Sequence, residues 1–338
     1  MAWSIPDDLP SVSERWATPD FRTELEAWVA GEVGAVRQSE QFRLRPWSTV
    51  WRVDTTAGVF YAKQNCPLQG FEAALVAELQ TIAPDRVVPA AAVDLDRGFL
   101  LTPDQGPVLW RQGAPSSPGT WESLVVEASR LQREVSPHAD RLVTRVGLTA
   151  LPPERSGEQA ADRIEALAAL PAGDPRRLVP AAAAGLRAHL PVVQCWGDQV
   201  AALGLPLTLQ HNDLHEANAF DTPTGLRFFD FGDAVVAHPL SALLVPLNIA
   251  GYDLGEDPTD PRLRRIADAA LEVWSDLVPV RDLRAALPAA LQLGRLGRAE
   301  SWLRCAASMN ATERTEFGPH AATWLGTLIE DPPVRFDG

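Results

Sequence analysis

Cysteine is scarce in this sequence, and long apolar runs are missing from it. Cys66, Cys195 and Cys305 are the only cysteines in 338 residues. Because their number is odd and no two lie close together, they favour neither a disulfide framework nor a zinc site, and we interpret them as small packing residues. No apolar run reaches the length of a membrane span, and no basic region followed by a hydrophobic one opens the chain. We therefore expect a cytoplasmic protein with no membrane partner.

Positive charge is also in short supply. The 44 acidic residues outnumber the 30 basic ones, and the formal net charge is −14. A protein that binds nucleic acid neutralises phosphates with Lys and Arg, so we expect no nucleic-acid partner. The acidic surface is compatible with a cationic substrate, although such a surface mainly serves solubility.

Lysine is almost absent. Lys63 is the only lysine among the 30 basic residues, which leaves 29 arginines. Arginine was evidently acceptable wherever a surface positive charge was wanted. We therefore expect Lys63 to occupy a position that needs a compact ammonium group, where a planar guanidinium does not fit.

The length and the apolar pattern indicate two lobes. A chain of 338 residues can bury two separate cores. After a polar, irregular stretch at residues 1–17, Thr18 and Pro19 mark the start of a helix. Strands are expected at residues 42–45, 50–55, 59–64, 91–95 and 98–102, with a helix at 71–82. Helices dominate from residue 120 on, apart from a loop region at 136–158, and the helix expected over 281–308 should break or kink at Pro288.

The most informative stretch runs from His211 to Asn218 and is followed by Asp230-Phe231-Gly232-Asp233. A short buried strand at residues 207–210 precedes it, and the residues between the two motifs read as a hairpin. A hairpin folds its ends together, so Asn218 and Asp230 should lie side by side, with Asp213 on the preceding loop. Two groups that can bind Mg²⁺ beside a free carboxylate that can take a proton are what phosphoryl transfer needs.

The spacing within this stretch is that of a kinase catalytic loop. Asp213 and Asn218 are five residues apart, as in H-R-D-x-x-x-x-N, and residues 230–232 repeat the metal-binding D-F-G. With His215 in the loop, the stretch resembles the His-x-Asp-Leu/Ile-His-x-x-Asn motif of aminoglycoside phosphotransferases and choline kinases. The resemblance implies an α+β, protein-kinase-like bilobal fold. Residues 1–110 would form a small antiparallel-sheet lobe with an N-terminal helix, and residues 111–338 a larger, mainly helical lobe with the catalytic loop and the acceptor cleft. The Gly-, Pro- and Ser-rich run at 113–119 supports this boundary.

The same resemblance assigns roles to the catalytic stretch. Asp213 would be the catalytic base, and Asn218 and Asp230 would hold Mg²⁺. His211 and His215 would brace the loop by hydrogen bonds, since the motif already contains its base. The family normally has an aspartate about eleven residues after the metal-binding one, which stabilises the loop. Ser241 stands at that position here.

The resemblance also indicates a nucleotide site in the first lobe. Lys63 ends a strand like the V-A-I-K strand whose lysine reaches the nucleotide phosphates; the alternative is an edge-strand lysine that points to water. Glu72 would pair with Lys63 and hold it in position, and Glu78 is a second candidate for this role. No Gly-rich loop is present between the first two strands. We therefore expect Ser48 and Thr49 to bind phosphate through hydroxyl and backbone N–H donors; the alternative is that they belong to an ordinary turn.

Two further groups of residues complete the expected site. Thr102 lies in the stretch at residues 100–106, where kinases join their lobes and backbone groups read adenine. For the acceptor, Asp233 lies three residues past the metal ligand, and Glu300, Trp302 and Arg304 lie on a C-terminal helix. For this last trio the alternative is a helical ion pair of Glu300 with Arg304 and a core tryptophan.

The function implied is the ATP- and Mg²⁺-dependent transfer of a γ-phosphoryl group to a hydroxyl of a small polar acceptor, such as an aminoglycoside, an amino sugar or a similar sugar. Two other classes stay open. A catalytically inactive nucleotide-binding or sensing protein would lack one of the key residues, and none is missing. A metal-dependent hydrolase could use the His and Asp cluster, but two-metal sites need more ligands than the hairpin offers.

Overall fold

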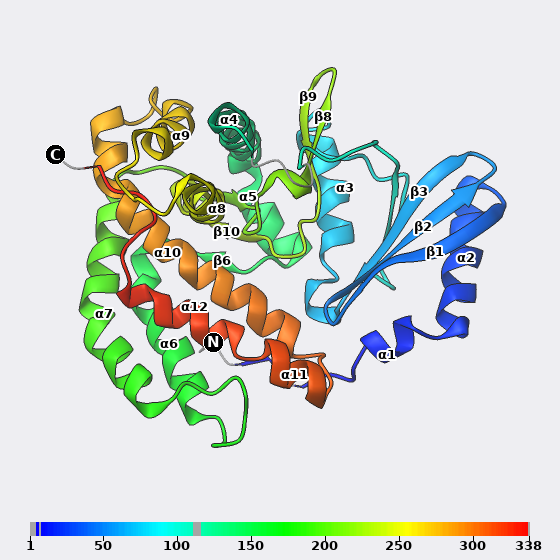
Figure 1. Ribbon diagram of the computed structural model, residues 1–338, viewed down its shortest axis with the longest axis horizontal. Coiled ribbons are helices and arrows are strands. Elements are labelled where there is room, and N and C mark those ends of the chain that lie inside the picture. Colours follow the sequence, from blue (N-terminus) through cyan, green and yellow to red (C-terminus); the bar gives the residue numbers. More distant parts are fainter. Residues whose placement is uncertain (1–4, 7, 111–115, 337–338) are drawn as a thin grey trace.

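The protein has two lobes (Figure 1), as the resemblance implied. The computed structural model describes residues 5–6, 8–110 and 116–336. One lobe is built on an antiparallel sheet and the other is mainly helical, so the expected α+β bilobal fold is confirmed.

The sheet of the first lobe has five strands in the order β1-β2-β3-β5-β4. Their bounds are β1 (Val36–Arg45), β2 (Ser48–Thr55), β3 (Gly58–Asn65), β4 (Ala92–Asp94) and β5 (Phe99–Pro103). All five were predicted, but β1 begins at residue 36 rather than 42. This edge strand is mostly exposed, so its first half carries no alternation of apolar and polar residues from which a strand could be predicted.

Helices cover both sides of this sheet. On the outer side, α2 (Pro19–Val33) starts at the expected cap, where the Thr18 side chain accepts a hydrogen bond from the Phe21 N–H. A buried cluster that includes Trp16, Leu25 and Phe99 joins the sheet to α2 and to α1 (Ser13–Trp16), a short helix in a stretch expected to be irregular. On the other side, α3 (Glu72–Ile82) lies between the sheet and the helical lobe (Figure 1).

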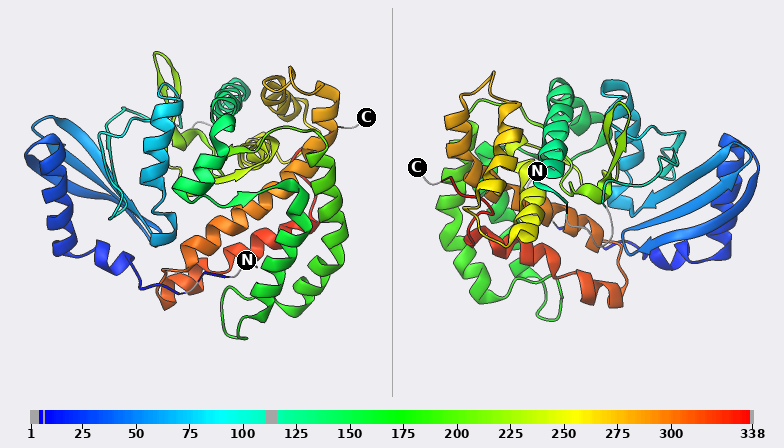
Figure 2. Two further views of the ribbon diagram at one scale, coloured as in Figure 1. Left: turned by 180° about the vertical axis from the view of Figure 1, so that it is seen from behind. Right: turned by 45° about the horizontal axis from the view of Figure 1, so that its top comes forward.

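The helical lobe is organised around one long helix, α10 (Val280–Ala306), which crosses it diagonally (Figures 1 and 2). The other helices are α4 (Pro118–Val135), α5 (Ala139–Arg141), α6 (Ser156–Ala169), α7 (Pro180–Ala201), α8 (Leu244–Leu254), α9 (Pro261–Glu272), α11 (Ala311–Phe317) and α12 (His320–Gly326). Pro288 lies inside α10 without ending it. Helix α11 and the helical turns within residues 136–158 were not predicted. Among the described residues, no helix combines the length and apolar character that crossing a membrane requires.

Short strands in the helical lobe hold the two motif segments. They are β6 (Ala150–Leu151), β7 (Thr208–Gln210), β8 (Ala219–Thr222), β9 (Gly225–Phe228) and β10 (Val235–Ala237). β10 pairs with β7 on one side and with β6 on the other, and β8 pairs with β9 as the predicted hairpin. The loops from β7 to β8 and from β9 to β10 therefore emerge next to each other.

Three smaller expectations concerned the linker, the N-terminal stretch and the cysteines. Of the expected linker, residues 113–115 lie outside the described residues, and its end already belongs to α4, with Ser117 as the cap. Leu9, which precedes α1, contacts the helical lobe, because its N–H donates to Ala307 O at 2.7 Å. Cys66 and Cys305 are buried, as expected of packing residues, but Cys195 is exposed.

Candidate active site

A cavity of about 860 Å³ lies between the two lobes, within the roughly 300–1,000 Å³ range typical of ligand sites. Seven of the residues expected at the site line it: Ser48, Lys63, Glu72, Thr102, Asp213, Asn218 and Asp230. The other five do not: Thr49, Asp233, Glu300, Trp302 and Arg304.

The pairing of β2 decides which residues of the first lobe face the cavity. Val50 lies opposite Lys63 of β3, and Ser48 lies opposite Asn65. Because successive side chains of a strand point to opposite faces, Thr49 points away from the cavity. Its side chain is fully buried under the sheet, where the hydroxyl accepts from Gln41 Nε2 at 3.1 Å. A phosphate role for the Thr49 hydroxyl was therefore a wrong expectation.

The turn between β1 and β2 is short and rests on the helical lobe. It consists of Pro46 and Trp47. The Trp47 ring packs edge-on against Trp302 of α10 and Phe317 of α11, with centroid distances of 5.3 Å in both cases. Trp302 therefore anchors this turn and offers no open wall to an acceptor.

Lys63 lies at the centre of an ion-pair cluster. Its Nζ is 2.6 Å from Glu72 Oε2 and 2.5 Å from Asp230 Oδ1. Burial acts to lower the pKa of Lys63, but the two carboxylates outweigh it and the pKa is raised. Lys63 is thus held as an ammonium group between a helix of one lobe and a loop of the other.

Of the two glutamates considered for Lys63, only Glu72 contacts it. Glu72 also accepts from the Phe231 N–H at 2.7 Å and from Asn65 Nδ2 at 2.5 Å. Glu78, the second candidate, forms an ion pair with Arg141 instead.

The loop from β7 to β8 is braced by its histidines. His211 Nε2 lies 2.8 Å from Phe229 O, and its Nδ1 accepts from the Asp213 N–H. Burial lowers the pKa of His211, so the ring is neutral and donates from Nε2. His215 Nδ1 accepts from the Ala217 N–H at 3.2 Å, and its Nε2 lies 3.5 Å from Asp213 Oδ2. Burial opposes protonation of His215, but the hydrogen bond to Asp213 outweighs it and the pKa is raised.

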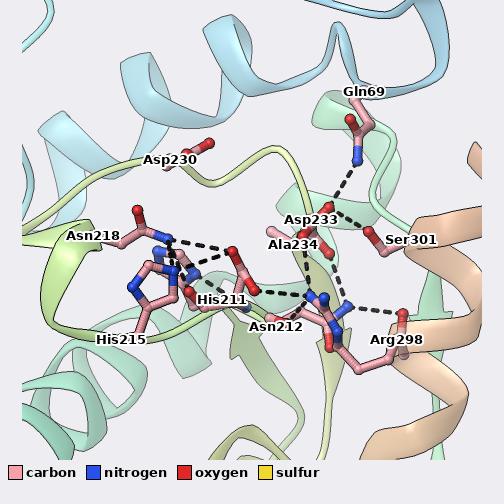
Figure 3. Close-up of polar contacts among 12 residues, drawn as sticks. Gln69, His211, Asn212, His215, Asn218, Asp230, Asp233, Ala234, Arg298 and Ser301 are labelled. Atoms are coloured by element: carbon pink, nitrogen blue, oxygen red, sulfur yellow. Dashed lines mark hydrogen bonds and ion pairs between the residues drawn. The ribbon is translucent and has the colours of Figure 1, made fainter. Parts of the chain in front are cut away.

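Asp213 is held as an ionised carboxylate. Burial acts to raise its pKa, but the hydrogen bond from His215 and the charge of Arg298 outweigh this effect and lower the pKa. The Asn218 amide donates to Asp213 O at 2.9 Å, which orients that side chain. In Figure 3 the Asn218 amide oxygen points away from this bond and toward Asp230.

The hairpin brings Asn218 and Asp230 together as expected. The Phe229 N–H donates to Asn218 O at 3.2 Å and so joins the two ends. Asp230 has a φ of 64°, a left-handed conformation that Asp tolerates better than most residues. The Asn218 amide oxygen and the Asp230 carboxylate suit Mg²⁺, which takes one or two protein ligands and completes its shell with waters and phosphate oxygens.

The remaining residues considered for the acceptor form ion pairs and hydrogen bonds with other residues of the protein. Glu300 pairs with Arg163 at 2.6 Å and not with Arg304, so the alternative of a helical ion pair between Glu300 and Arg304 is wrong too. Arg304 donates to the backbone oxygens of Asp233 and Ala234. Asp233 is bonded to Gln69, Arg298 and Ser301. The side chains of Asp233, Glu300 and Arg304 are therefore not directed into the cavity.

Sequence reasoning missed the part of α10 that supports the catalytic loop. Asn212 Nδ2 donates to Gly297 O at 2.8 Å, and Arg298 Nη1 donates to Asn212 O at 2.5 Å. A side chain at residue 297 would press on Asn212, because a Cβ there would lie 3.1 Å from Asn212 Oδ1. These contacts fix the loop in a chain that has Ser241 where the family has an aspartate. They join residues about 85 positions apart, and no local pattern marks them.

Similarity to known proteins is found at the level of structure. No family model matches the chain, and no curated protein matches it in sequence. Among solved structures, a type I macrolide 2′-phosphotransferase superposes with a TM-score of 0.58 at 14% identity over 92% of this chain and 98% of its own. The chain has the fold of these phosphotransferases.

Two further structures with this fold were solved with ligands. A mutant aminoglycoside 2′-phosphotransferase in complex with GDP gives a TM-score of 0.58 at 15% identity, covering 92% of this chain and 97% of its own. An amicoumacin kinase in complex with AMP-PNP, Ca²⁺ and amicoumacin gives 0.55 at 13% identity, covering 96% and 97%. At such identities the likeness concerns the fold, and the chemistry rests on the residues of this chain.

Proposed function

We propose that this protein is a small-molecule kinase, which transfers the γ-phosphoryl group of ATP to a hydroxyl of a small polar acceptor with the help of Mg²⁺. The observation that carries the proposal is the convergence of Lys63, Asp213, Asn218 and Asp230 on one cavity between the lobes. The complexes of the related fold with GDP, AMP-PNP, Ca²⁺ and amicoumacin support a nucleotide, a divalent cation and a small acceptor.

Each residue has a role in this reaction. Lys63, held by Glu72, binds the α and β phosphates. Asn218 and Asp230 hold Mg²⁺, which neutralises charge on the phosphates. Asp213 orients the acceptor hydroxyl and takes its proton while the hydroxyl oxygen bonds to the γ-phosphorus and the bond to the β–γ bridging oxygen breaks, so that ADP leaves. The protein contributes mainly positioning and charge stabilisation. Ser48 lies at the cavity in the row next to Lys63 and could donate its hydroxyl to a phosphate.

The acceptor belongs to the class of aminoglycosides, amino sugars and similar sugars. The walls of the acceptor site should be formed by cavity residues of the helical lobe that follow Asp213 in the chain, such as Glu216 and Ile249. Glu216 is buried, with 5% exposure, and forms no ion pair with any residue the structure describes. It replaces Asp233, Glu300 and Arg304 as the residue to test for acceptor contact.

The function can be tested in two steps. The change in melting temperature with ATP or GTP, each with and without Mg²⁺, reports nucleotide binding and base preference. A screen of aminoglycosides, amino sugars and simple sugars for acceptor-dependent ADP release then reports transfer, with Asp213→Asn as the matched inactive control. Nucleotide binding without ADP release for any acceptor would indicate a sensing protein. Hydrolysis of a phosphoester without a nucleotide would indicate a hydrolase.

A further inference from the structure

The catalytic loop contains no basic residue, and a cation reaches it from a distant helix. Residues 211–218 include no Lys or Arg. Arg298 of α10 fills this gap, because its Nη1 lies 3.2 Å from Asp213 Oδ1 and donates to Asn212 O and to Asp233 Oδ2 at 3.0 Å (Figure 3). Arg298 is only 8% exposed and does not line the cavity.

Asp233 fixes the position of this guanidinium. Its carboxylate accepts from Arg298, from Ser301 of the same helix, and from Gln69 Nε2 at 2.8 Å. The Trp324 ring lies 5.4 Å from the centre of the Arg298 guanidinium. With its contacts set on several sides, the Arg298 side chain has little freedom to move.

Further hydrogen bonds connect Gln69 to Glu72 and Lys63, on the side of the cavity where we propose that the nucleotide binds. Gln69 O accepts from Asn65 Nδ2 at 3.2 Å, and Asn65 Nδ2 also donates to Glu72, the partner of Lys63. Asp233 therefore lies in a connected framework that has Lys63 at one end and Asp213 at the other.

We propose that Arg298, held by Asp233, is a positioning residue for Asp213. The inference rests on the proposed function and deepens it. The contact with Arg298 occupies Oδ1 of Asp213, and it leaves Oδ2 on the side of His215 and Asn218, which line the cavity. A carboxylate without this contact can rotate, and a misplacement of about 1 Å in a reacting group costs roughly a hundredfold in rate.

The test separates kcat from KM in a set of variants. In Arg298→Met we expect kcat to fall by about a hundredfold, while the KM of the nucleotide stays nearly unchanged because Arg298 does not line the cavity. All three contacts are made by Nη1 of Arg298. Arg298→Lys keeps a positive charge with three donors but on a shorter side chain, so it should recover only part of the lost kcat. Wild-type kcat in Arg298→Met would overturn the inference.

A double variant distinguishes positioning from support of the fold. Arg298→Met leaves the Asp233 carboxylate part-buried without its cation, which lowers stability. Arg298→Met with Asp233→Asn removes both charges, so the melting temperature should recover while kcat stays low. Recovery of kcat together with the melting temperature would show that Arg298 supports only the fold and would overturn the inference.

Arg295→Met is the matched control. Arg295 lies one turn earlier on α10, is 5% exposed, and bonds to backbone oxygens of Thr327 and Asp331, away from the cavity. Its loss should lower the melting temperature and leave kcat unchanged. If the wild-type protein releases no ADP with any acceptor, the proposed function fails and the inference fails with it. Normal transfer by Arg298→Met overturns the inference alone.

Discussion

Replacing Lys63 by methionine should destabilise the protein even in the absence of any nucleotide. The change removes the ammonium group that pairs with Glu72 and Asp230 and keeps a side chain of similar length. The Glu72 side chain is only 4% exposed, so its charge is left buried without a cation. The Asp230 side chain is 36% exposed, so water screens its charge and Asp230 contributes little to the loss of stability.

The magnitude follows from the burial of Glu72. Breaking a buried ion pair by removing one partner typically costs about 3–5 kcal/mol. Two other donors, the Phe231 N–H and Asn65 Nδ2, remain on Glu72, and they offset part of the loss. We therefore expect the free energy of unfolding to fall by about 3 kcal/mol, the lower end of that range.

The loss should depend on pH in a defined direction. Burial raises the pKa of Glu72, and the charge of Lys63 opposes this, so in Lys63→Met the pKa is raised further. A carboxyl group whose pKa is higher in the folded state contributes stability below its unfolded pKa of about 4.3 and loses it as the pH rises through the folded pKa. The deficit of Lys63→Met should thus be small near pH 5 and grow toward about pH 8.

Denaturant midpoints of the parent and of Lys63→Met at these two pH values measure the effect. Lys63→Met combined with Glu72→Gln is the matched control. Both charges are then absent, and the amide oxygen can still accept from Phe231 and Asn65, so most of the stability should return. An equal deficit at both pH values, or no recovery in the double variant, would refute the account of this ion pair.

The other predictions concern Asp213 and Asp230, which line the cavity, and Trp47, which lies in the turn between β1 and β2. Asp213→Asn should retain nucleotide binding in a melting-temperature assay while its transfer rate falls by about 10²–10⁴, the usual contribution of a general base; turnover near that of the parent would contradict the role of Asp213. Asp230→Ala should need more Mg²⁺ to bind nucleotide, since it deletes a charged ligand, and a nucleotide affinity that is unchanged at limiting Mg²⁺ would count against that assignment. Trp47→Ala should lower the free energy of unfolding by roughly 2 kcal/mol, less than the 3–5 kcal/mol of a fully buried aromatic, and unchanged stability would mean that the contacts with Trp302 and Phe317 contribute nothing.

The sequence by itself determined the fold and the grouping of the motif residues. Strand periodicity, the cap at Thr18 and the hairpin between Asn218 and Asp230 are local signals, in which neighbours along the chain decide the backbone conformation. A hairpin must bring its ends together, so the proximity of Asn218 and Asp230 followed without a structure. The choice of Glu72 over Glu78 also followed, although from the order of residues that the resemblance supplied.

Only the tertiary structure decided which of the other polar residues face the cavity. Ser48 and Thr49 are adjacent, and the register of β2 against β3 turns one toward the cavity and the other under the sheet. Asp233 lies close to the motif in sequence, yet its carboxylate accepts from Gln69 and Arg298 and is not directed into the cavity. Such partners come from segments far apart in the chain, where the packing of α10 against the loop after β7 sets the contact. Because that packing depends on the whole helical lobe, no local pattern in the sequence reveals it.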